Sequence, residues 1–243
     1  MKILFVIPAR YASTRFPGKP LAIIKGKSMI QRVYEQVSIA AATIGNAEVL
    51  VATDDDRIMH HVATFGGKVM MTSGKHQSGT DRVAEAANFW NTKPDVVINV
   101  QGDEPFIRPE QILQLVDCFQ KPETQIATLV KSIHTHEELN NPNVVKAVVD
   151  AKGGALYFSR SVIPFHRNKH VDVFLHQYLK HIGIYGFRFE VLQQITLLPQ
   201  GQLELIESLE QLRWLENGYS IQTATTEFES VAIDHPDDLK NLN

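Results

Sequence analysis

The sequence predicts an α/β protein with a mostly parallel central sheet flanked by helices. Two observations support this prediction. Short, continuously apolar segments alternate with segments of helical spacing through the first half of the chain, and polar residues cluster directly after the apolar segments. Continuous apolar segments are typical of strands that are covered on both faces of a parallel sheet. The chain has 243 residues, 44% of them hydrophobic, which is enough for one large domain with a smaller lobe.

The first half of the chain shows strands and helices in strict alternation. Ser28 is expected to cap a first helix, and Pro109 is expected in the first turn of a later one. Strands are predicted at Ile3–Ile7, Val49–Ala52, Val69–Met71 and Val96–Val100. Helices are predicted over the apolar positions of 30–37, 58–65, 83–90 and 112–119. Alternation of this kind indicates a parallel α/β sheet.

The second half of the chain is less regular. Strands are predicted at 126–130, 144–149, 155–158, 182–187, 220–225 and 231–233. One helix is predicted from Leu203 to Glu216, and the segment from Arg160 to Lys180 is expected to be a long loop. We therefore expect one domain over 1–243, with a nucleotide-binding half to about 130 and a smaller substrate lobe over about 131–230.

Composition and charge exclude several classes of protein. A single cysteine, Cys118, excludes a disulfide framework. The net charge of -3 gives no reason to expect a nucleic-acid partner. The apolar segment Ile3–Ile7 is too short for a membrane span, so we expect a cytoplasmic protein without membrane insertion.

Polar residues follow each of the first four predicted strands. The ends of parallel strands meet at one edge of a sheet, where ligands bind in open α/β folds. The loop after the first strand carries Arg10, Arg15 and Lys19 and no carboxylate, which favours a phosphate-binding loop. The plainer alternative is a structural loop whose cations pair with acids elsewhere. A P-loop is excluded because Ser13 stands where its first glycine is required and Pro20 where it needs serine or threonine.

Two groups of acidic residues are candidate metal ligands. Asp103 follows an apolar strand and could hold Mg²⁺ against phosphates, and Gly102 beside it permits close approach of a ligand. The alternative for Asp103 is a turn or a helix cap. In the run Asp54–Asp56 we favour helix capping over metal binding for the last two residues and leave Asp54 open.

Motifs along nearly the whole chain carry a family resemblance. The matching stretches are 7–21, 51–54, 79–82, 99–105, 155–160, 181–186, 207–213 and 233–239, which include IPAR, GTDR and NVQGDEP. Together they resemble the 3-deoxy-manno-octulosonate cytidylyltransferase (CMP-Kdo synthetase) family. One departure is His235, where the family more often has threonine.

The resemblance implies a Rossmann-like nucleotidyltransferase fold and a role for each matched residue. It implies that the nucleotide-binding residues are Pro8, Ala9, Arg10, Arg15, Lys19, Ser78, Gly79, Arg82, Gln101 and Asp103, with Arg10, Arg15, Lys19 and Asp103 also catalytic. Asp103 and Asp234 would carry Mg²⁺, with 231–243 returning to the metal site. The sugar 3-deoxy-D-manno-octulosonate (Kdo) would contact Arg160, His181, Tyr185, Glu207 and Glu210.

The activity implied by the resemblance is transfer of CMP from CTP to the anomeric hydroxyl of Kdo, for lipopolysaccharide biosynthesis, by a homodimer. Three alternatives stay open at this point. One is a cytidylyltransferase for another acidic sugar, such as the 8-amino analogue of Kdo, or for a polyol phosphate. Another is a metal-dependent glycosyltransferase that uses Asp54–Asp56. The last is a module that binds CTP without turnover.

Overall fold

The first apolar segment of the chain forms the central strand of a parallel sheet. In β1 (Ile3–Ala9), the consecutive side chains of Phe5, Val6 and Ile7 are fully buried. Because neighbouring side chains of a strand point to opposite faces, both faces of this strand are covered. β1 pairs in parallel with β4 (Ala47–Thr53) and with β6 (Val96–Asn99). The predicted α/β class is confirmed.

The structure is a computed structural model that describes residues 1–12, 16–168, 172–229, 233 and 235–241. The chain divides into two compact units. The first contains Met1–Leu113, Gly186–Thr196 and Glu229–Asn243, and the second contains Gln114–Tyr185 and Leu197–Phe228. Each is described by itself below.

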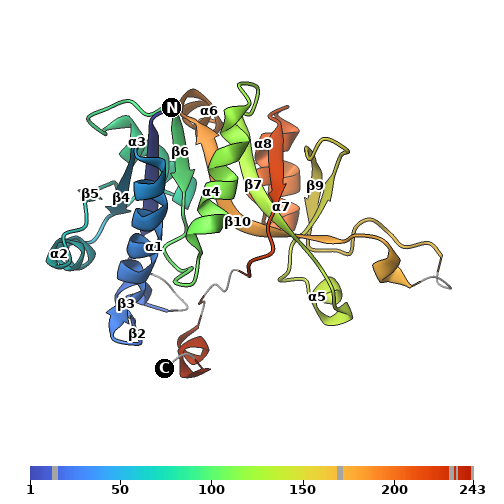
Figure 1. Ribbon diagram of the computed structural model, residues 1–243, viewed down its shortest axis with the longest axis horizontal. Coiled ribbons are helices and arrows are strands. Elements are labelled where there is room, and N and C mark those ends of the chain that lie inside the picture. The colour runs from blue at the N-terminus through green and yellow to red at the C-terminus, as the bar shows by residue number, and fades with distance from the viewer. Residues whose placement is uncertain (13–15, 169–171, 230–232, 234, 242–243) are drawn as a thin grey trace. The chain divides into compact units, whose positions relative to one another are not determined.

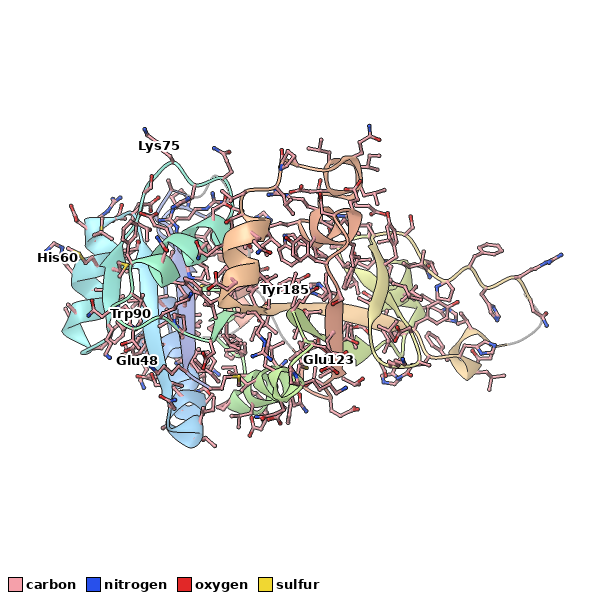
Figure 2. All side chains as sticks on the ribbon, turned by 90° about the horizontal axis from the view of Figure 1, so that it is seen from above. Glu48, His60, Lys75, Trp90, Glu123 and Tyr185 are labelled. Atoms are coloured by element: carbon pink, nitrogen blue, oxygen red, sulfur yellow. The ribbon has the colours of Figure 1, made fainter. Side chains whose placement is uncertain are left out.

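Helices cover the sheet of the first unit. α1 (Met29–Ile44) and α3 (Gly79–Asn88) both contact β1 and β4, and the two views place them on opposite faces of these strands (Figures 1 and 2). Ser28 caps α1 as predicted, because its side-chain oxygen accepts a hydrogen bond from the Gln31 N–H across 3.2 Å. Pro109 begins α4, also as predicted.

The remaining elements of the first unit are short. β5 (Val69–Met71) pairs in parallel with β4. The others are η1 (Lys19–Leu21), a hairpin of β2 (Ile23–Ile24) and β3 (Lys27–Ser28), α2 (Asp56–Thr64), α4 (Pro109–Asp117, whose last four residues belong to the second unit), α6 (Phe189–Ile195) and η4 (Pro236–Asn241). The part of the chain that the structure describes contains no helix long and apolar enough to cross a membrane.

The second unit is built on a mixed set of strands. β11 (Ile221–Thr225) pairs in parallel with β7 (Ile126–Ser132), and β7 lies beside β10 (Leu179–Arg188), whose last three residues belong to the first unit. Antiparallel pairs join β10 to β8 (Lys146–Val149) and β8 to β9 (Ala155–Ser159). Its helices are α5 (His136–Asn140), α7 (Gln202–Glu207) and α8 (Gln211–Glu216), with 3-10 turns η2 (Cys118–Gln120) and η3 (Val173–Leu175).

The single helix predicted from Leu203 to Glu216 is wrong, because the chain leaves helical geometry between α7 and α8. Ser208 ends α7 in the left-handed conformation, with φ 53° and ψ 48°. An α-helix cannot continue through a left-handed residue. Glu207 and Glu210 therefore do not share one helix face: Glu207 ends α7, and Glu210 is the N-cap of α8.

The strand predictions of the second half are confirmed from β7 to β11, with small shifts at their ends. The exception is the strand predicted at 231–233. Residues 231 and 232 lie outside the described part of the chain, and Ile233 belongs to no strand.

Candidate active site

A cavity of about 250 Å³ opens at the carboxyl ends of β1 and β6 and at the first turn of α3. This is the edge of a parallel sheet at which ligands bind in α/β folds. Its walls come from four separate segments of the first unit. The lining residues are Pro8, Ala9, Arg10, Lys19, Pro20, His76, Gln77, Ser78, Gly79, Arg82, Gln101, Gly102 and Asp103.

A partly buried ion pair lies in the lining of the cavity. The Lys19 ammonium donates to Asp103 Oδ2 across 2.7 Å and to the backbone carbonyl of Ile233 across 2.8 Å. The Ile233 N–H in turn donates to the Asp103 carbonyl across 3.0 Å. The Lys19 side chain is 14% exposed and the Asp103 side chain 31%. One lysine thus joins the loop after β1, the loop after β6 and the C-terminal segment.

The path of the cationic loop is fixed at its described ends. Gly18 has φ +70°, a conformation that favours glycine, and its N–H donates to the Tyr11 carbonyl across 2.9 Å. The Arg57 guanidinium lies 3.2 Å from the centre of the Tyr11 ring, and Asp55 holds that guanidinium at 2.6 Å. These contacts fasten the loop that carries Lys19 to the start of α2.

Gly102 permits the close approach of two strand ends. A Cβ atom at this position would lie 2.8 Å from the Pro8 carbonyl oxygen, closer than any real side chain is found. The turn after β6 can therefore pass beside the end of β1 only because residue 102 lacks a side chain. This contact brings Gln101 and Asp103 to the same cavity as Ala9 and Arg10.

The first turn of α3 supplies the opposite wall. Ser78 caps this helix, and its Oγ accepts the Asp81 N–H across 3.1 Å. Ser78 and Gly79 therefore lie at a helix N-terminus, where the backbone dipole favours negative charge. Arg82, one turn further, is buried with only 5% of its surface exposed.

The three aspartates after β4 have three different surroundings. Arg82 donates to Asp54 Oδ2 across 2.7 Å and to the Thr72 hydroxyl across 2.6 Å. Asp55 caps α2 as predicted, because it accepts the Arg57 N–H across 2.9 Å. Asp56 lies in the first turn of that helix. The bonds of Asp54 to Arg82 and of Asp55 to Arg57 favour the structural interpretation of the run.

A second set of predicted site residues lies in the second unit, around Glu207. Both oxygens of this carboxylate accept hydrogen bonds at the end of β9: Oε1 from the Ser159 hydroxyl across 2.5 Å, and Oε2 from the Arg160 N–H across 2.9 Å. The Arg160 guanidinium donates to the Glu207 carbonyl across 2.7 Å. Glu207 therefore holds Arg160 by two bonds and Ser159 by a third.

His181 and Tyr185 are four residues apart on β10, so their side chains lie on the same face of the strand. Their ring centres are 5.2 Å apart, and Thr128 Oγ1 lies 3.0 Å from His181 Nε2. Burial lowers the pKa of the His181 imidazole to about 3, so the ring is neutral at pH 7. Burial, with Glu210 nearby, raises the pKa of the Tyr185 hydroxyl well above its usual value. Both groups are neutral hydrogen-bonding groups.

The sequence predicted most of the cavity. Every predicted nucleotide-binding residue lines it except Arg15, which lies outside the described residues, as does Asp234. Three lining residues were not among the predicted site residues: Pro20, His76 and Gln77. Gly102 was predicted only to permit close approach of a ligand. His76 and Gln77 directly precede the Ser78 motif, so their position in the sequence was the available signal. The sugar-site residues all belong to the second unit.

The metal-binding oxygen atoms at the cavity fit Mg²⁺ in complex with a nucleotide. Mg²⁺ in such sites is held by one or two carboxylates and by substrate phosphates, and it keeps several waters. Asp103 provides one carboxylate that lines the cavity. Among the described residues no group of three or more His, Cys, Asp or Glu side chains could hold a metal ion by itself. A metal here would thus depend on oxygen atoms of the nucleotide.

Comparison with known proteins agrees with this geometry. Residues 4–223 match the family model described as cytidylyltransferase. The chain is 56% identical to a 3-deoxy-manno-octulosonate cytidylyltransferase from Bacteroides thetaiotaomicron, over 99% of this chain and 96% of that protein. It is 50% identical to the protein of the same description from Thermodesulfovibrio yellowstonii, over 99% and 96%.

A solved structure is similar over the same length. It is described as CMP:2-keto-3-deoxy-manno-octonic acid synthetase complexed with CTP, and it matches with a TM-score of 0.90 and 44% identity over 99% of this chain and 96% of that one. A 4-diphosphocytidyl-2C-methyl-D-erythritol synthase from Anaerococcus prevotii matches with a TM-score of 0.63 at 13% identity, over 100% and 97%, which shows a shared fold alone. The chain belongs to the 3-deoxy-manno-octulosonate cytidylyltransferase family of nucleotidyltransferases.

Proposed function

We propose that this enzyme transfers CMP from CTP to the anomeric hydroxyl of Kdo and releases pyrophosphate. The observation that carries the proposal is the cavity of the first unit, in which predicted nucleotide-binding residues from four segments meet around the Lys19–Asp103 pair. The described relatives support the choice of CTP and Kdo. The product would serve lipopolysaccharide assembly.

The nucleotide is held by charge at one end of the cavity and by neutral groups at the other. Arg10 and Lys19 neutralise the triphosphate, together with Arg15, and the N-terminus of α3 adds the backbone N–H of Gly79, while the Ser78 N–H is bonded to Asp81 Oδ2. Gln101 and the backbone at Pro8 and Ala9 contact the nucleoside. Arg82 supports this wall through its bonds to Asp54 and Thr72.

Magnesium is the cofactor in this proposal, held by Asp103 and Asp234. It supplies neutralisation of the phosphate oxygens. The bond from Ile233 N–H to the Asp103 carbonyl supports the role of Asp234, because it fixes the residue next to Asp234 beside Asp103. This contact is also the reason to propose that 231–243 returns to the metal site.

The sugar is held in the lobe over about 131–230. Arg160 binds the sugar carboxylate by charge, while neutral His181 and Tyr185 donate to or accept from hydroxyl groups. Glu210 adds a carboxylate acceptor for hydroxyls. Glu207 acts on the sugar through Arg160, because both of its oxygens are already bonded at the end of β9.

The reaction is an in-line displacement at phosphorus. The anomeric oxygen of Kdo forms a bond to the α-phosphorus, the bond to the bridging oxygen of the β-phosphate breaks, and pyrophosphate leaves with the electron pair. The hydroxyl proton passes to solvent. Such transfers are accelerated chiefly by positioning and charge neutralisation, which is what a cationic cavity provides.

The test is pyrophosphate release by the purified protein with CTP, Mg²⁺ and a panel of acceptors: Kdo, its 8-amino analogue, another acidic sugar and a polyol phosphate. We expect release with Kdo that depends on both substrates. Release with another acceptor in preference to Kdo would reassign the sugar and leave the nucleotide chemistry in place. CTP binding without release for any acceptor would favour a binding module.

Two further properties belong to the same proposal. The reaction consumes CTP, so we place the enzyme in the cytoplasm. The second unit exposes large apolar side chains in its long loop, Phe165 at 81% and Leu175 at 73%, which supports a homodimer that covers them. Light scattering of the purified protein would give twice the chain mass of 27.3 kDa.

A further inference from the structure

The segment between β5 and α3, residues 72–78, forms one wall of the nucleotide cavity through His76 and Gln77. Both ends of this segment are fixed. The Thr72 N–H donates to the Thr53 carbonyl across 2.8 Å, and Ser78 caps α3. Between these ends, Lys75 projects from the protein at the turn of the segment (Figure 2). The Lys75 ammonium is therefore not part of the cavity wall.

One carboxylate holds the middle of the segment. Glu85, on α3, accepts the Ser73 N–H on Oε2 across 2.9 Å, and the same oxygen is hydrogen-bonded to His76 Nε2. Burial raises the pKa of the Glu85 carboxyl, but the bonds from His76 and Ser73 outweigh burial and leave the pKa lowered. The carboxylate therefore stays ionised at neutral pH, and one anion spans the segment from its start to His76.

This bond determines what His76 offers to a ligand. With Nε2 bonded to a carboxylate, that nitrogen carries a proton, and Nδ1 is the ring nitrogen left for a ligand. The pair of His76 with the Glu85 carboxylate has no net positive charge, and Gln77 is uncharged, while the Lys19–Asp103 pair lies on other segments of the cavity. A wall without net positive charge matches the base and ribose of a nucleotide, and the cations on the other segments match its phosphates.

We propose that His76 contacts the nucleoside portion of CTP and that Glu85 is a positioning residue that holds His76 in place. The inference rests on the proposed function and deepens it. It gives His76 a role in nucleotide recognition that the sequence motifs did not predict. It also gives Glu85 an effect on nucleotide binding that is exerted through the His76 ring.

The experiment compares the dissociation constants of CTP and CMP by calorimetry, without sugar, for wild type and variants. CTP and CMP share the nucleoside and differ in phosphates. His76→Ala should raise the dissociation constants of CTP and CMP by the same factor, about 3- to 10-fold for one hydrogen bond. Lys19→Ala should weaken CTP far more than CMP. Glu85→Ala should match His76→Ala, and the double variant should lose no more than either single variant.

Controls separate positioning from folding. Glu85→Gln keeps an acceptor oxygen for Ser73 and His76 and should regain most of the affinity that Glu85→Ala loses. Glu48→Ala removes a comparable ion pair, with Lys68, at the other end of β4, and should leave both constants unchanged. Thermal melting of each variant identifies any that fails to fold, and His76→Asn then replaces His76→Ala in the comparison.

The outcomes distinguish this inference from the proposed function. Wild-type affinity for both nucleotides in His76→Ala overturns the inference alone, and so does a loss confined to CTP. Additive losses in the double variant overturn the positioning role of Glu85. A wild-type protein that binds neither nucleotide overturns the proposed function and this inference with it.

Discussion

The Lys19 ammonium and the Asp103 carboxylate lie 2.7 Å apart in the lining of the nucleotide cavity. They are separated by 84 residues in the chain and follow two neighbouring parallel strands, β1 and β6. The pair keeps both charges at the cavity before a nucleotide arrives. In the proposed function, a phosphate would replace Asp103 beside the lysine, and Mg²⁺ would be held by Asp103 in place of the lysine.

Replacement of Lys19 by alanine should remove a charge that the transition state needs. We expect kcat/KM for CTP to fall by about 100- to 1000-fold, the usual effect of one electrostatic group aimed at developing charge. Steady-state kinetics measures it, and Lys68→Ala, which breaks a surface pair with Glu48, is the matched control. Equal rates for Lys19→Ala and the control would remove Lys19 from the triphosphate site.

Replacement of Asp103 by asparagine should weaken the metal-bound nucleotide while the fold persists. We expect kcat to fall by at least about 100-fold and the Mg²⁺ concentration for half-maximal rate to rise. The comparison is Asp56→Asn, on the first turn of α2, which should keep normal turnover. Loss of turnover in Asp56→Asn with normal turnover in Asp103→Asn would move the metal to the aspartates after β4.

Glu207→Gln should affect the sugar and spare the nucleotide. The variant weakens the two bonds that fix Arg160 and Ser159, so the Arg160 guanidinium loses its position. We expect KM for Kdo to rise by about 5- to 50-fold, the cost of one to two charged hydrogen bonds, with KM for CTP unchanged. The exposed Glu227→Gln variant is the control. A rise in KM for CTP alone would place Glu207 in nucleotide binding.

The desolvated imidazole of His181 should make the protein less stable in acid. Its pKa is lowered to about 3 in the fold, from 6.5. Between these values the unfolded chain binds the proton and the folded chain does not, so stability falls as pH decreases below 6.5. From pH 7 to pH 5 the loss from this residue is about 1–2 kcal/mol. Urea unfolding of His181→Asn should show a correspondingly smaller loss; an identical pH dependence would contradict the desolvated neutral ring.

Gly102→Ala should distort the cavity. The added Cβ would meet the Pro8 carbonyl oxygen at 2.8 Å, and the backbone on both sides would have to shift. We expect a loss of about 1–3 kcal/mol in unfolding free energy together with weaker CTP binding. Gly74→Ala is the control, because its Cβ would meet Asp54 no closer than 3.8 Å. Equal melting temperatures for the two variants would contradict the close approach.

Local pattern predicted the first unit well for a physical reason. In a parallel sheet the strands are buried on both faces and each is followed by a helix, so Ile3–Ile7 and Val96–Val100 are visible as apolar segments and their loops must meet at one edge. The cavity at Lys19 and Asp103 follows from that topology. Gly102 was identified for close approach in general, but its contact with Pro8 depends on tertiary structure.

The sequence predicted less of the second unit because its decisive features are not periodic. The spacing of apolar residues from Leu203 to Glu216 fits one helix, and only the backbone angles at Ser208 break it. The bonds of Glu207 to Ser159 and Arg160 join residues 48 and 47 positions apart, so no local pattern could predict them. The bond from Glu85 to His76 joins residues whose spacing has no helical or strand meaning, so pattern alone could not predict it.

The most direct test uses CTP that is radioactively labelled at the α-phosphate. The wild-type protein is incubated with this CTP, Kdo and Mg²⁺, and the products that carry the label are identified. If the cavity holds the triphosphate and the sugar attacks the α-phosphorus, the label appears in the sugar nucleotide and the released pyrophosphate is unlabelled, and Lys19→Ala slows both. Label that stays in CTP, or that appears in free CMP with no sugar nucleotide formed, would contradict the proposed transfer.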